Sequence, residues 1–208
     1  MPTAGSASLI AFEGGEGTGK STQAARFAER IGALLTREPG GTLLGERVRS
    51  LVLDPALGRV DARAEALLMA AARAQHVAEV IEPALAAGTS VVTDRYIGSS
   101  LAYQGYGHGL GVEALTTLSA WATADCAADL VILLVAPPRI TAGRLRRPTD
   151  RLEQLGKDFH KRVAEGFLEL AKTDPARWRV VDGTGTIAEV SERVWAAYEM
   201  WAKGSTDA

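Results

Sequence analysis

The stretch "FEGGEGTGKST", residues 12–22, decides the fold of this chain. It holds two glycines separated by four residues and followed at once by Lys20 and Ser21, which fits the phosphate-binding pattern G-x-x-x-x-G-K-[ST]. The apolar run "SLIAF" (8–12) precedes this loop, and a helical pattern over residues 20–34 follows it. Since the pattern binds phosphate where it joins a strand to a helix, the sequence predicts a nucleotide-binding P-loop.

The residues of this loop predict how ATP is held. Glycines allow successive backbone N–H groups to point at one anion, and the positive end of the following helix lies behind them. Lys20 would bridge the terminal phosphates, and the Ser21 hydroxyl would bind Mg²⁺, for which Asp94 at the end of "SVVTD" supplies a second anchor. The predicted ATP-binding residues are Gly14, Gly15, Glu16, Gly17, Thr18, Gly19, Lys20, Ser21 and Thr22, and the predicted metal ligands are Ser21 and Asp94.

Strand and helix patterns alternate along the rest of the chain. Continuous apolar runs are typical of strands that are buried on both faces of a parallel sheet. Such runs occupy residues 8–12, 90–94, 129–135 and 179–182, and helical patterns occupy residues 20–34, 43–53, 61–87, 111–123, 154–173 and 186–202. The alternation predicts an α/β fold with helices on both faces of the sheet.

Composition narrows the class of protein. A length of 208 residues without a low-complexity linker predicts a single domain over 1–208, and a net charge of −2 argues against a general binder of nucleic acid polymers. No run approaches the ~20 apolar residues that a membrane helix needs, so we expect a cytoplasmic protein. We expect the single cysteine, Cys126, to be buried in an alanine-rich helix, and His76, His108 and His160 to lie on the surface, because their spacing is not that of metal ligands.

Four arginines predict a second, acceptor-binding side of the site. Arg37, Arg49, Arg73 and Arg95 lie on segments that should converge at the carboxyl ends of the strands, where open α/β sheets bind ligands. Arg73 interrupts the apolar stretch "LLMAAA", and a buried guanidinium needs an anionic or polar partner. Met69 lies four residues earlier on the same helix face, where it could pack on a flat ring. Neutral donors and acceptors for a nucleobase edge follow Asp94 closely, and they are Ser99, Ser100, Tyr103 and Gln104.

Several motifs together resemble one family. They are "FEGGEGTGKST", "TREPGGT" (36–42), "ARAQ" after "LLMAA", "DRY" with "AYQG" (94–105) and "DRLE" (150–153), and in this order they are similar to the bacterial thymidylate kinase family. The resemblance implies a three-layer P-loop kinase fold, with a five-stranded parallel sheet, helices on both faces and a small lid. It also implies phosphorylation of dTMP to dTDP by ATP with Mg²⁺, and a homodimer.

The resemblance assigns the acceptor residues. It implies that Arg49 and Arg95 hold the 5′-phosphate of dTMP, that Arg73 and Gln104 read the thymine edge with help from Ser100, and that Tyr103 lies near the deoxyribose. The family usually has phenylalanine where this chain has Met69. The remaining predicted substrate-binding residues are Glu13, Arg37, Pro39 and Ser99.

A catalytic arginine is missing from the phosphate loop. In one branch of the family the loop carries it, at a position that matches Gly17 here, so the resemblance implies that a lid at about 143–156 supplies it instead. That segment offers Arg144, Arg146, Arg147 and Arg151, of which we favour the last two. The predicted catalytic residues are therefore Lys20, Asp94, Arg147, Arg151 and Glu16.

Glu16 is an acid in a loop that binds anions. Because it would repel the phosphate oxygens of ATP, we expect its side chain to point toward the acceptor, near the sugar hydroxyl or a Mg²⁺-bound water. Glu13 could share that role or simply accept backbone hydrogen bonds. Two alternatives to a dTMP kinase are a kinase for another nucleoside monophosphate and a nucleotide-switched binding module.

Overall fold

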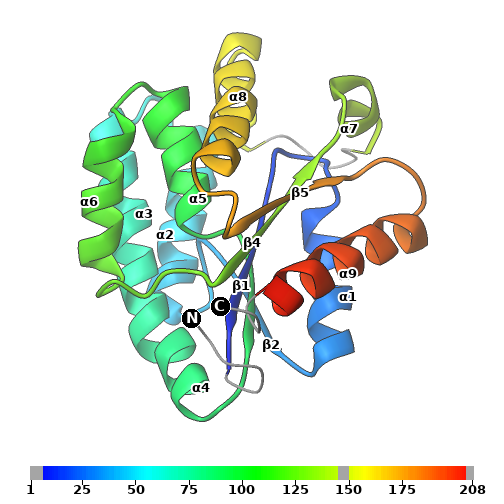
Figure 1. Cartoon of the computed structure of the whole chain (residues 1–208). Coiled ribbons are helices and arrows are strands. Elements are labelled where there is room, and N and C mark those ends of the chain that lie inside the picture. Colours follow the sequence, from blue (N-terminus) through cyan, green and yellow to red (C-terminus); the bar gives the residue numbers. More distant parts are fainter. Residues whose placement is uncertain (1–6, 145–149, 205–208) are drawn as a thin grey trace.

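The protein is built around one parallel sheet of five strands, β2-β3-β1-β4-β5. The computed structural model describes residues 7–144 and 150–204. The strands are β1 (Leu9–Glu13), β2 (Leu34–Arg37), β3 (Val91–Asp94), β4 (Leu130–Val135) and β5 (Trp178–Asp182). Helices cover both faces of the sheet (Figure 1), which confirms the predicted fold class.

The helices divide between the two faces. One face carries α1 (Lys20–Ile31) and α9 (Ile187–Gly204), which pack against each other and on the strands through a core that includes Phe12, Phe27 and Trp201. The other face carries α2 (Leu43–Leu53), α3 (Ala62–His76), α4 (Glu82–Ala86), α5 (Ile97–Ser100), α6 (Val112–Ala122) and α8 (Lys157–Thr173). Shorter elements are the 3₁₀ turn η1 (Pro55–Leu57), the π-helical segments η2 (Val77–Ile81) and η3 (Leu101–Gly107), and α7 (Pro138–Arg144).

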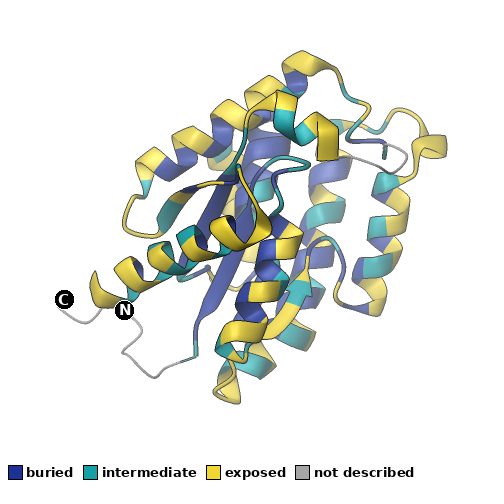
Figure 2. Ribbon diagram, turned by 90° about the vertical axis from the view of Figure 1, so that its right-hand side faces the viewer, coloured by how far each residue is buried: buried dark blue, intermediate teal, exposed yellow. Residues whose placement is uncertain are grey.

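Burial explains why the central strands form. Every residue of β1 is buried, and so are all but the last residues of β3 and β4, as expected for strands with helices on both sides. Figure 2 shows the central strands buried in the middle of the molecule and the outer faces of the helices exposed. The helices therefore pack their apolar faces toward the sheet, and the hydrophobic core lies between the helices and the strands.

The strand register brings the functional segments to one edge of the sheet. Asp94, the last residue of β3, lies opposite Phe12 of β1 and Arg37 of β2. The phosphate loop follows β1, and Arg95 follows β3 directly. Ligand sites in open α/β sheets lie at these carboxyl ends, so the register alone assembles both predicted halves of the site.

Three local features differ from the sequence prediction. β2 was not among the predicted strands, because it is a short edge strand whose two leucines, Leu34 and Leu35, are exposed. The helical segment over residues 97–107 was also missed. Cys126 lies in the connection between α6 and β4 and is half-buried, so its predicted place inside a helix is wrong.

Candidate active site

The phosphate loop connects β1 to α1 and is closely packed against its neighbours. A side chain at Gly14, where φ is +139°, would bring its Cβ to 2.4 Å from the Leu134 carbonyl oxygen. At Gly17, where φ is +72°, the Cβ would lie 2.6 Å from the carbonyl oxygen of Thr141 in α7. Only glycine fits both the backbone conformation and the space at these positions.

Lys20 lies over the loop with its charge buried. Its Nζ donates to the Gly15 carbonyl oxygen at 3.3 Å and lies 3.7 Å from Glu16 Oε2. Burial lowers the pKa of Lys20, as does the charge of Arg95, whereas Glu16 and Asp94 act in the opposite direction. A bound phosphate would add negative charge next to this amine and favour its protonated form.

Asp94 carries a polar atom without a protein partner. Among the described residues, its Oδ1 is the buried side-chain oxygen or nitrogen that has no hydrogen bond. Asp94 and Ser21 line the same cleft, beside Lys20. An unpaired buried carboxylate oxygen is costly unless a cation or a donor binds it, and carboxylate and hydroxyl oxygens suit Mg²⁺. This donor set fits the magnesium ion that the sequence predicts.

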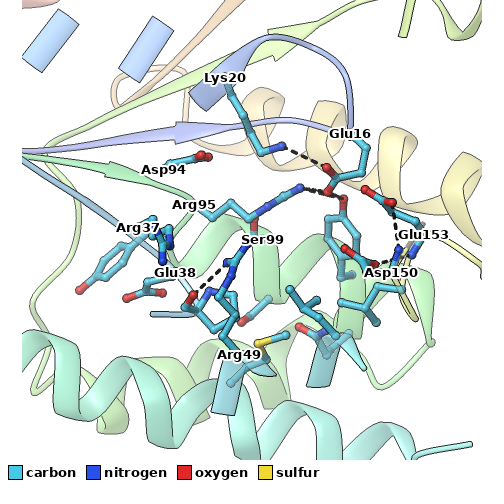
Figure 3. Close-up of a pocket in the computed structure, with 18 of the residues that line it drawn as sticks. Glu16, Lys20, Arg37, Glu38, Arg49, Asp94, Arg95, Ser99, Asp150 and Glu153 are labelled. Carbon is cyan, nitrogen blue, oxygen red and sulfur yellow. Dashed lines mark hydrogen bonds and ion pairs between the residues drawn. The ribbon is translucent and has the colours of Figure 1, made fainter. Parts of the chain in front are cut away.

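Arg95 joins the loop to the helix on the acceptor side. Its Nη1 donates to the Gly14 carbonyl oxygen at 3.2 Å and to Ser99 Oγ at 3.0 Å, and its Nη2 donates to Glu16 Oε1 and, at 3.2 Å, to the hydroxyl of Tyr103. Figure 3 shows Glu16 between Lys20 and Arg95, with Asp94 close by. The Glu16 side chain thus contacts Arg95 and Tyr103 on one side and Lys20 on the other.

Arg73 has the anionic partner that its burial requires. Its Nε donates to Glu38 Oε2 at 2.7 Å, and its Nη2 donates to Ser100 Oγ at 2.9 Å and to the Tyr96 carbonyl oxygen at 3.1 Å. The other carboxylate oxygen of Glu38 is 3.0 Å from Nδ1 of His76. This fixed guanidinium lines the cleft, so it can offer further N–H groups to a ligand there.

The remaining arginines surround the turn that follows β2. Arg49 donates to the Pro39 carbonyl oxygen at 3.0 Å, and Arg37 donates to Glu46 Oε1 at 2.9 Å. The peptide bond between Glu38 and Pro39 is cis. Burial lowers the pKa of Arg49, as does the charge of Arg37, so an anion between these two guanidinium groups would relieve their repulsion.

One cleft contains most of the predicted residues. It lies beside the carboxyl end of β3, where Asp94 and Arg95 contribute to its lining. Predicted residues that line it are Glu16, Lys20, Ser21, Arg37, Pro39, Arg49, Met69, Arg73, Asp94, Arg95, Ser99, Ser100, Tyr103 and Gln104. It therefore places a phosphate loop, four arginines and a polar helix face around one space.

A family model described as thymidylate kinase matches residues 12–194 of this chain. The chain belongs to the thymidylate kinase family. A thymidylate kinase of Bifidobacterium longum (strain DJO10A) is 46% identical over 199 residues, which cover 92% of this chain and 95% of that protein. The thymidylate kinase of Deinococcus radiodurans is 46% identical over 196 residues, covering 91% and 95% of the two chains.

A solved structure of the family shares the fold. The crystal structure of thymidylate kinase from Ehrlichia chaffeensis has a TM-score of 0.78 and 31% sequence identity, and the match covers 94% of this chain and 99% of that one. Family membership confirms the resemblance and makes the protein an enzyme of the thymidylate kinase family. The comparisons lend no support to a different acceptor or to a nucleotide switch.

Glu13 lies behind the cleft of this thymidylate kinase family member rather than in it. Its side chain is fully buried and accepts hydrogen bonds from the backbone N–H groups of Tyr96 and Ser99, at 3.0 and 2.9 Å, and from Ser99 Oγ at 2.6 Å. Burial raises its pKa to about 7. The predicted contact of Glu13 with substrate is therefore corrected: it accepts backbone hydrogen bonds and holds the segment that carries Arg95.

The lid arginines differ from the prediction. Arg147 lies outside the described residues. Arg151 is buried and donates to the Val52 carbonyl oxygen at 2.8 Å and to Glu65, so this structure does not bring it to the phosphate loop. Arg144, which we did not favour, donates instead to the backbone oxygens of Gly17 and Gly183, at 3.3 and 3.0 Å. Helix α7 ends at Arg144 beside the loop, which places that side chain there.

The histidines and several lining residues were not recognised from the sequence. His76 is fully buried between Thr36 and Glu38, so its predicted surface position is wrong. His108 and His160 are also partly buried. The cleft is also lined by residues that the sequence did not predict, which are Glu38, Leu53, Tyr96, Asp150, Leu152, Glu153 and His160. Glu38 carried a signal, because it lies within "TREPGG" beside two predicted residues.

In the described part of the chain, no helix has the length and apolar character needed to cross a membrane.

Proposed function

We propose that the protein transfers the γ-phosphoryl group of ATP to the 5′-phosphate of dTMP, which yields dTDP and ADP for dTTP synthesis. The observation that carries this proposal is Arg95, which contacts the phosphate loop at Gly14 and Glu16 and the acceptor-side helix at Ser99 and Tyr103. Phosphoryl transfer requires donor and acceptor phosphates to lie in line and their charges to be neutralised. A guanidinium at the junction of the two halves serves both needs.

The loop residues 14–22 bind ATP, with Lys20 at its terminal phosphates. Arg49 and Arg95 bind the 5′-phosphate of dTMP, and Arg37, Pro39 and Ser99 complete this end of the cleft. Arg73, Gln104 and Ser100 contact the thymine, Met69 packs on its ring, and Tyr103 lies near the deoxyribose. Glu16 orients Arg95 and faces the acceptor. These assignments are supported by the lining of one cleft.

Magnesium would be held by Ser21 and Asp94. The unpaired Oδ1 of Asp94 supports this assignment. When bound, the ion supplies neutralisation of the charge on the β- and γ-phosphates. Asp94 itself also attracts Lys20 and Arg95 and so helps to hold both cations beside the reacting phosphates.

A further arginine from a lid at about 143–156 would neutralise the moving phosphoryl group, and we keep Arg147 and Arg151 as candidates for it. Because Arg151 is paired with Glu65, it reaches the loop only if that pair separates. Arg144 is a third candidate, since it already donates to the backbone of the phosphate loop. The lid belongs to a single kinase domain over residues 1–208.

The protein would act in the cytoplasm as a homodimer, and on mononucleotides rather than on nucleic acid polymers. Large apolar side chains are exposed on the neighbouring helices α2, α3 and α6, at Leu43, Leu67 and Trp121. An exposed apolar surface of this kind marks a protein interface. Leu43, Leu67 and Trp121 are not among the described residues that line the cleft.

The test is ADP formation from ATP and Mg²⁺ with dTMP, dUMP, dGMP, AMP or no acceptor. We expect turnover that depends on dTMP and falls sharply with AMP and dGMP. Arg73→Ala should raise the KM for dTMP more than it changes the KM for ATP, because the guanidinium lies on the acceptor side of the cleft. Equal ADP formation with and without acceptor would overturn the proposal.

A further inference from the structure

Glu65 on α3 is a fully buried carboxylate that accepts from three side chains. Its Oε1 accepts from Gln104 Nε2 at 2.8 Å and from His108 Nε2 at 3.1 Å, and its Oε2 accepts from Arg151 Nη2. Burial alone would raise the pKa of Glu65, but the hydrogen bonds from His108, Arg151 and Gln104 outweigh burial and lower it. Glu65 is therefore ionised at neutral pH and can only accept hydrogen bonds.

An ionised Glu65 fixes the orientation of the Gln104 amide. Only the Nε2 end of that amide can donate to a carboxylate, so the Oε1 end must point elsewhere. Gln104 lines the cleft, and in the described part of the chain no hydrogen bond joins its Oε1 to the protein. The amide thus presents an acceptor, and not a donor, to a ligand in the cleft.

Arg73 supplies a donor next to this acceptor. It donates to Ser100, which lies four residues before Gln104 on the helical segment formed by α5 and η3. Its Nε and Nη2 groups are engaged by Glu38, Tyr96 and Ser100, and it lines the same cleft. The cleft wall therefore carries a fixed donor beside a fixed acceptor.

This order of donor and acceptor matches particular base edges. Thymine and uracil present a carbonyl oxygen, O4, beside an N3–H donor. The O4 oxygen can accept from Arg73, and the N3–H group can donate to Gln104 Oε1. Cytosine presents the reverse order, an amino group beside an N3 acceptor. A site whose polar groups are fixed rejects the reversed edge strongly, because the buried partners are then left unpaired.

We propose that Glu65 is a positioning residue that sets the pyrimidine selectivity of the enzyme by holding the Gln104 amide with its oxygen toward the base. The proposal rests on the proposed dTMP kinase function. Glu65 acts through Gln104 and does not itself line the cleft. His108 and Arg151, which donate to the two oxygens of this carboxylate, keep it ionised together with Gln104.

The decisive variant is Glu65→Gln. Because Arg151 still requires an acceptor, the introduced amide turns its oxygen toward Arg151 and its NH₂ group toward Gln104. The Gln104 amide then flips and presents its own NH₂ group to the base. We expect the ratio of kcat/KM for dTMP to that for dCMP to fall roughly 10- to 100-fold, while the ratio for dTMP to dUMP stays unchanged, since these bases share one edge.

His108→Asn is the matched control. It replaces the imidazole that donates to Glu65 Oε1 by a shorter amide but leaves the carboxylate, Arg151 and Gln104 in place, so the dTMP to dCMP ratio should stay within about threefold of the unmutated enzyme. If Glu65→Gln lowers kcat/KM for dTMP, dUMP and dCMP by the same factor, Glu65 has only a structural role and the proposal is wrong. Failure of the unmutated enzyme to phosphorylate dTMP would instead overturn the proposed function.

A double variant keeps the proposal testable if Glu65→Gln does not fold. In E65Q/Q104E, the amide at position 65 donates to one oxygen of the carboxylate at position 104. The other oxygen of that carboxylate faces the base and again acts as an acceptor. Selectivity for dTMP over dCMP should return to within about tenfold of the unmutated enzyme. Binding of dTMP and dCMP without ATP, measured by calorimetry, should show the same loss and recovery; a double variant that binds both nucleotides equally would overturn the proposal.

Discussion

Arg95 illustrates how much of this site depends on one side chain. It adopts a left-handed backbone conformation, with φ of 74°, directly after β3. A non-glycine residue in this region costs about 1 kcal/mol or more and persists where its surroundings hold it there. The hydrogen bonds of its guanidinium to Gly14, Ser99, Glu16 and Tyr103 provide that hold. These contacts therefore offset the backbone strain and keep the guanidinium at the junction of the two halves of the cleft.

Glu16→Gln should weaken the acceptor side of the site. The change removes the charge that orients Arg95, and a hydrogen bond between charged groups contributes about 1.5–3 kcal/mol. We expect kcat/KM for dTMP to fall roughly 10- to 100-fold, while the Kd of ATP changes by less than about threefold. Steady-state kinetics and ATP titration measure the two effects. Loss of ATP binding alone would contradict this role.

Glu13→Gln should change how stability depends on pH. Burial raises the pKa of Glu13 from its ordinary value of 4.5 to about 7. Between these values the folded protein retains a proton that the unfolded chain loses, so this group's contribution to stability decreases as pH rises and is lost above about pH 7. The variant keeps the acceptor for Tyr96 and Ser99 but does not titrate.

The stability of the unmutated protein relative to Glu13→Gln should therefore fall by roughly 2–3 kcal/mol between about pH 5 and pH 8. Urea unfolding at several pH values measures this difference, and groups common to both proteins cancel. A difference that stays constant with pH would show that Glu13 is already ionised at pH 5.

At the scale of elements, the turn between β2 and α2 supports the acceptor side of the cleft. It begins directly after Arg37, carries Glu38 and Pro39, and packs against the buried His76 of α3 through Gly41. A Cβ at Gly41 would lie 2.6 Å from His76 Cδ2 and 2.8 Å from Thr36 Oγ1. The turn and the helix thus fit only with a glycine between them.

Gly41→Ala should destabilise the protein more than Gly88→Ala, its matched control. Both glycines have φ of +78°, but the position of a Cβ at Gly88 has no atom within 4 Å. Gly88→Ala should cost about 1 kcal/mol from backbone strain, and Gly41→Ala roughly 1–3 kcal/mol more from the clash. Urea unfolding gives both values. Equal losses would mean that the turn shifts freely away from His76.

The sequence predicted the elements that local patterns define. The phosphate loop, β1, β3 and β4 follow from glycine spacing and apolar runs, and Arg73 follows from a charge in an apolar stretch. Edge strand β2 was missed because its exposed residues carry no burial pattern. The pairing of Arg151 with Glu65, which lie 86 residues apart, depends on tertiary packing that no local pattern records. The role of Glu13 likewise depends on the backbone of a distant segment.

At the scale of the whole molecule, the helices on the two faces of the sheet differ in how they expose apolar side chains. The α1 and α9 face is closed by an aromatic cluster in which the ring of Phe27 lies 5.1 Å from that of Tyr198. On the other face, exposed apolar side chains lie on three neighbouring helices: Leu43 of α2 is 78% exposed, Leu67 of α3 59% and Trp121 of α6 83%. The second face is therefore the one that we expect to meet another copy of the chain.

Leu67→Glu should weaken the proposed homodimer. In a two-fold symmetric interface each substitution occurs twice and buries two charges, so the dissociation constant should rise roughly 100-fold or more. Met200→Glu is the control, since Met200 is 69% exposed on α9, on the opposite face of the sheet. Sedimentation velocity should show monomers for the first variant only. Dimers in both variants would place the interface elsewhere, and monomers of the unmutated chain would rule out the dimer.

Cys126 is the single cysteine of the chain, and the backbone oxygen of this residue accepts a hydrogen bond from the Tyr96 hydroxyl at 2.7 Å. Tyr96 immediately follows Arg95, so a fluorescent probe attached to this thiol would report on the segment that carries Arg95. No cysteine would have to be removed first. Burial raises the pKa of the thiol, so attachment should be faster in alkaline buffer. Labelling of this kind would follow the enzyme's motions during turnover in real time.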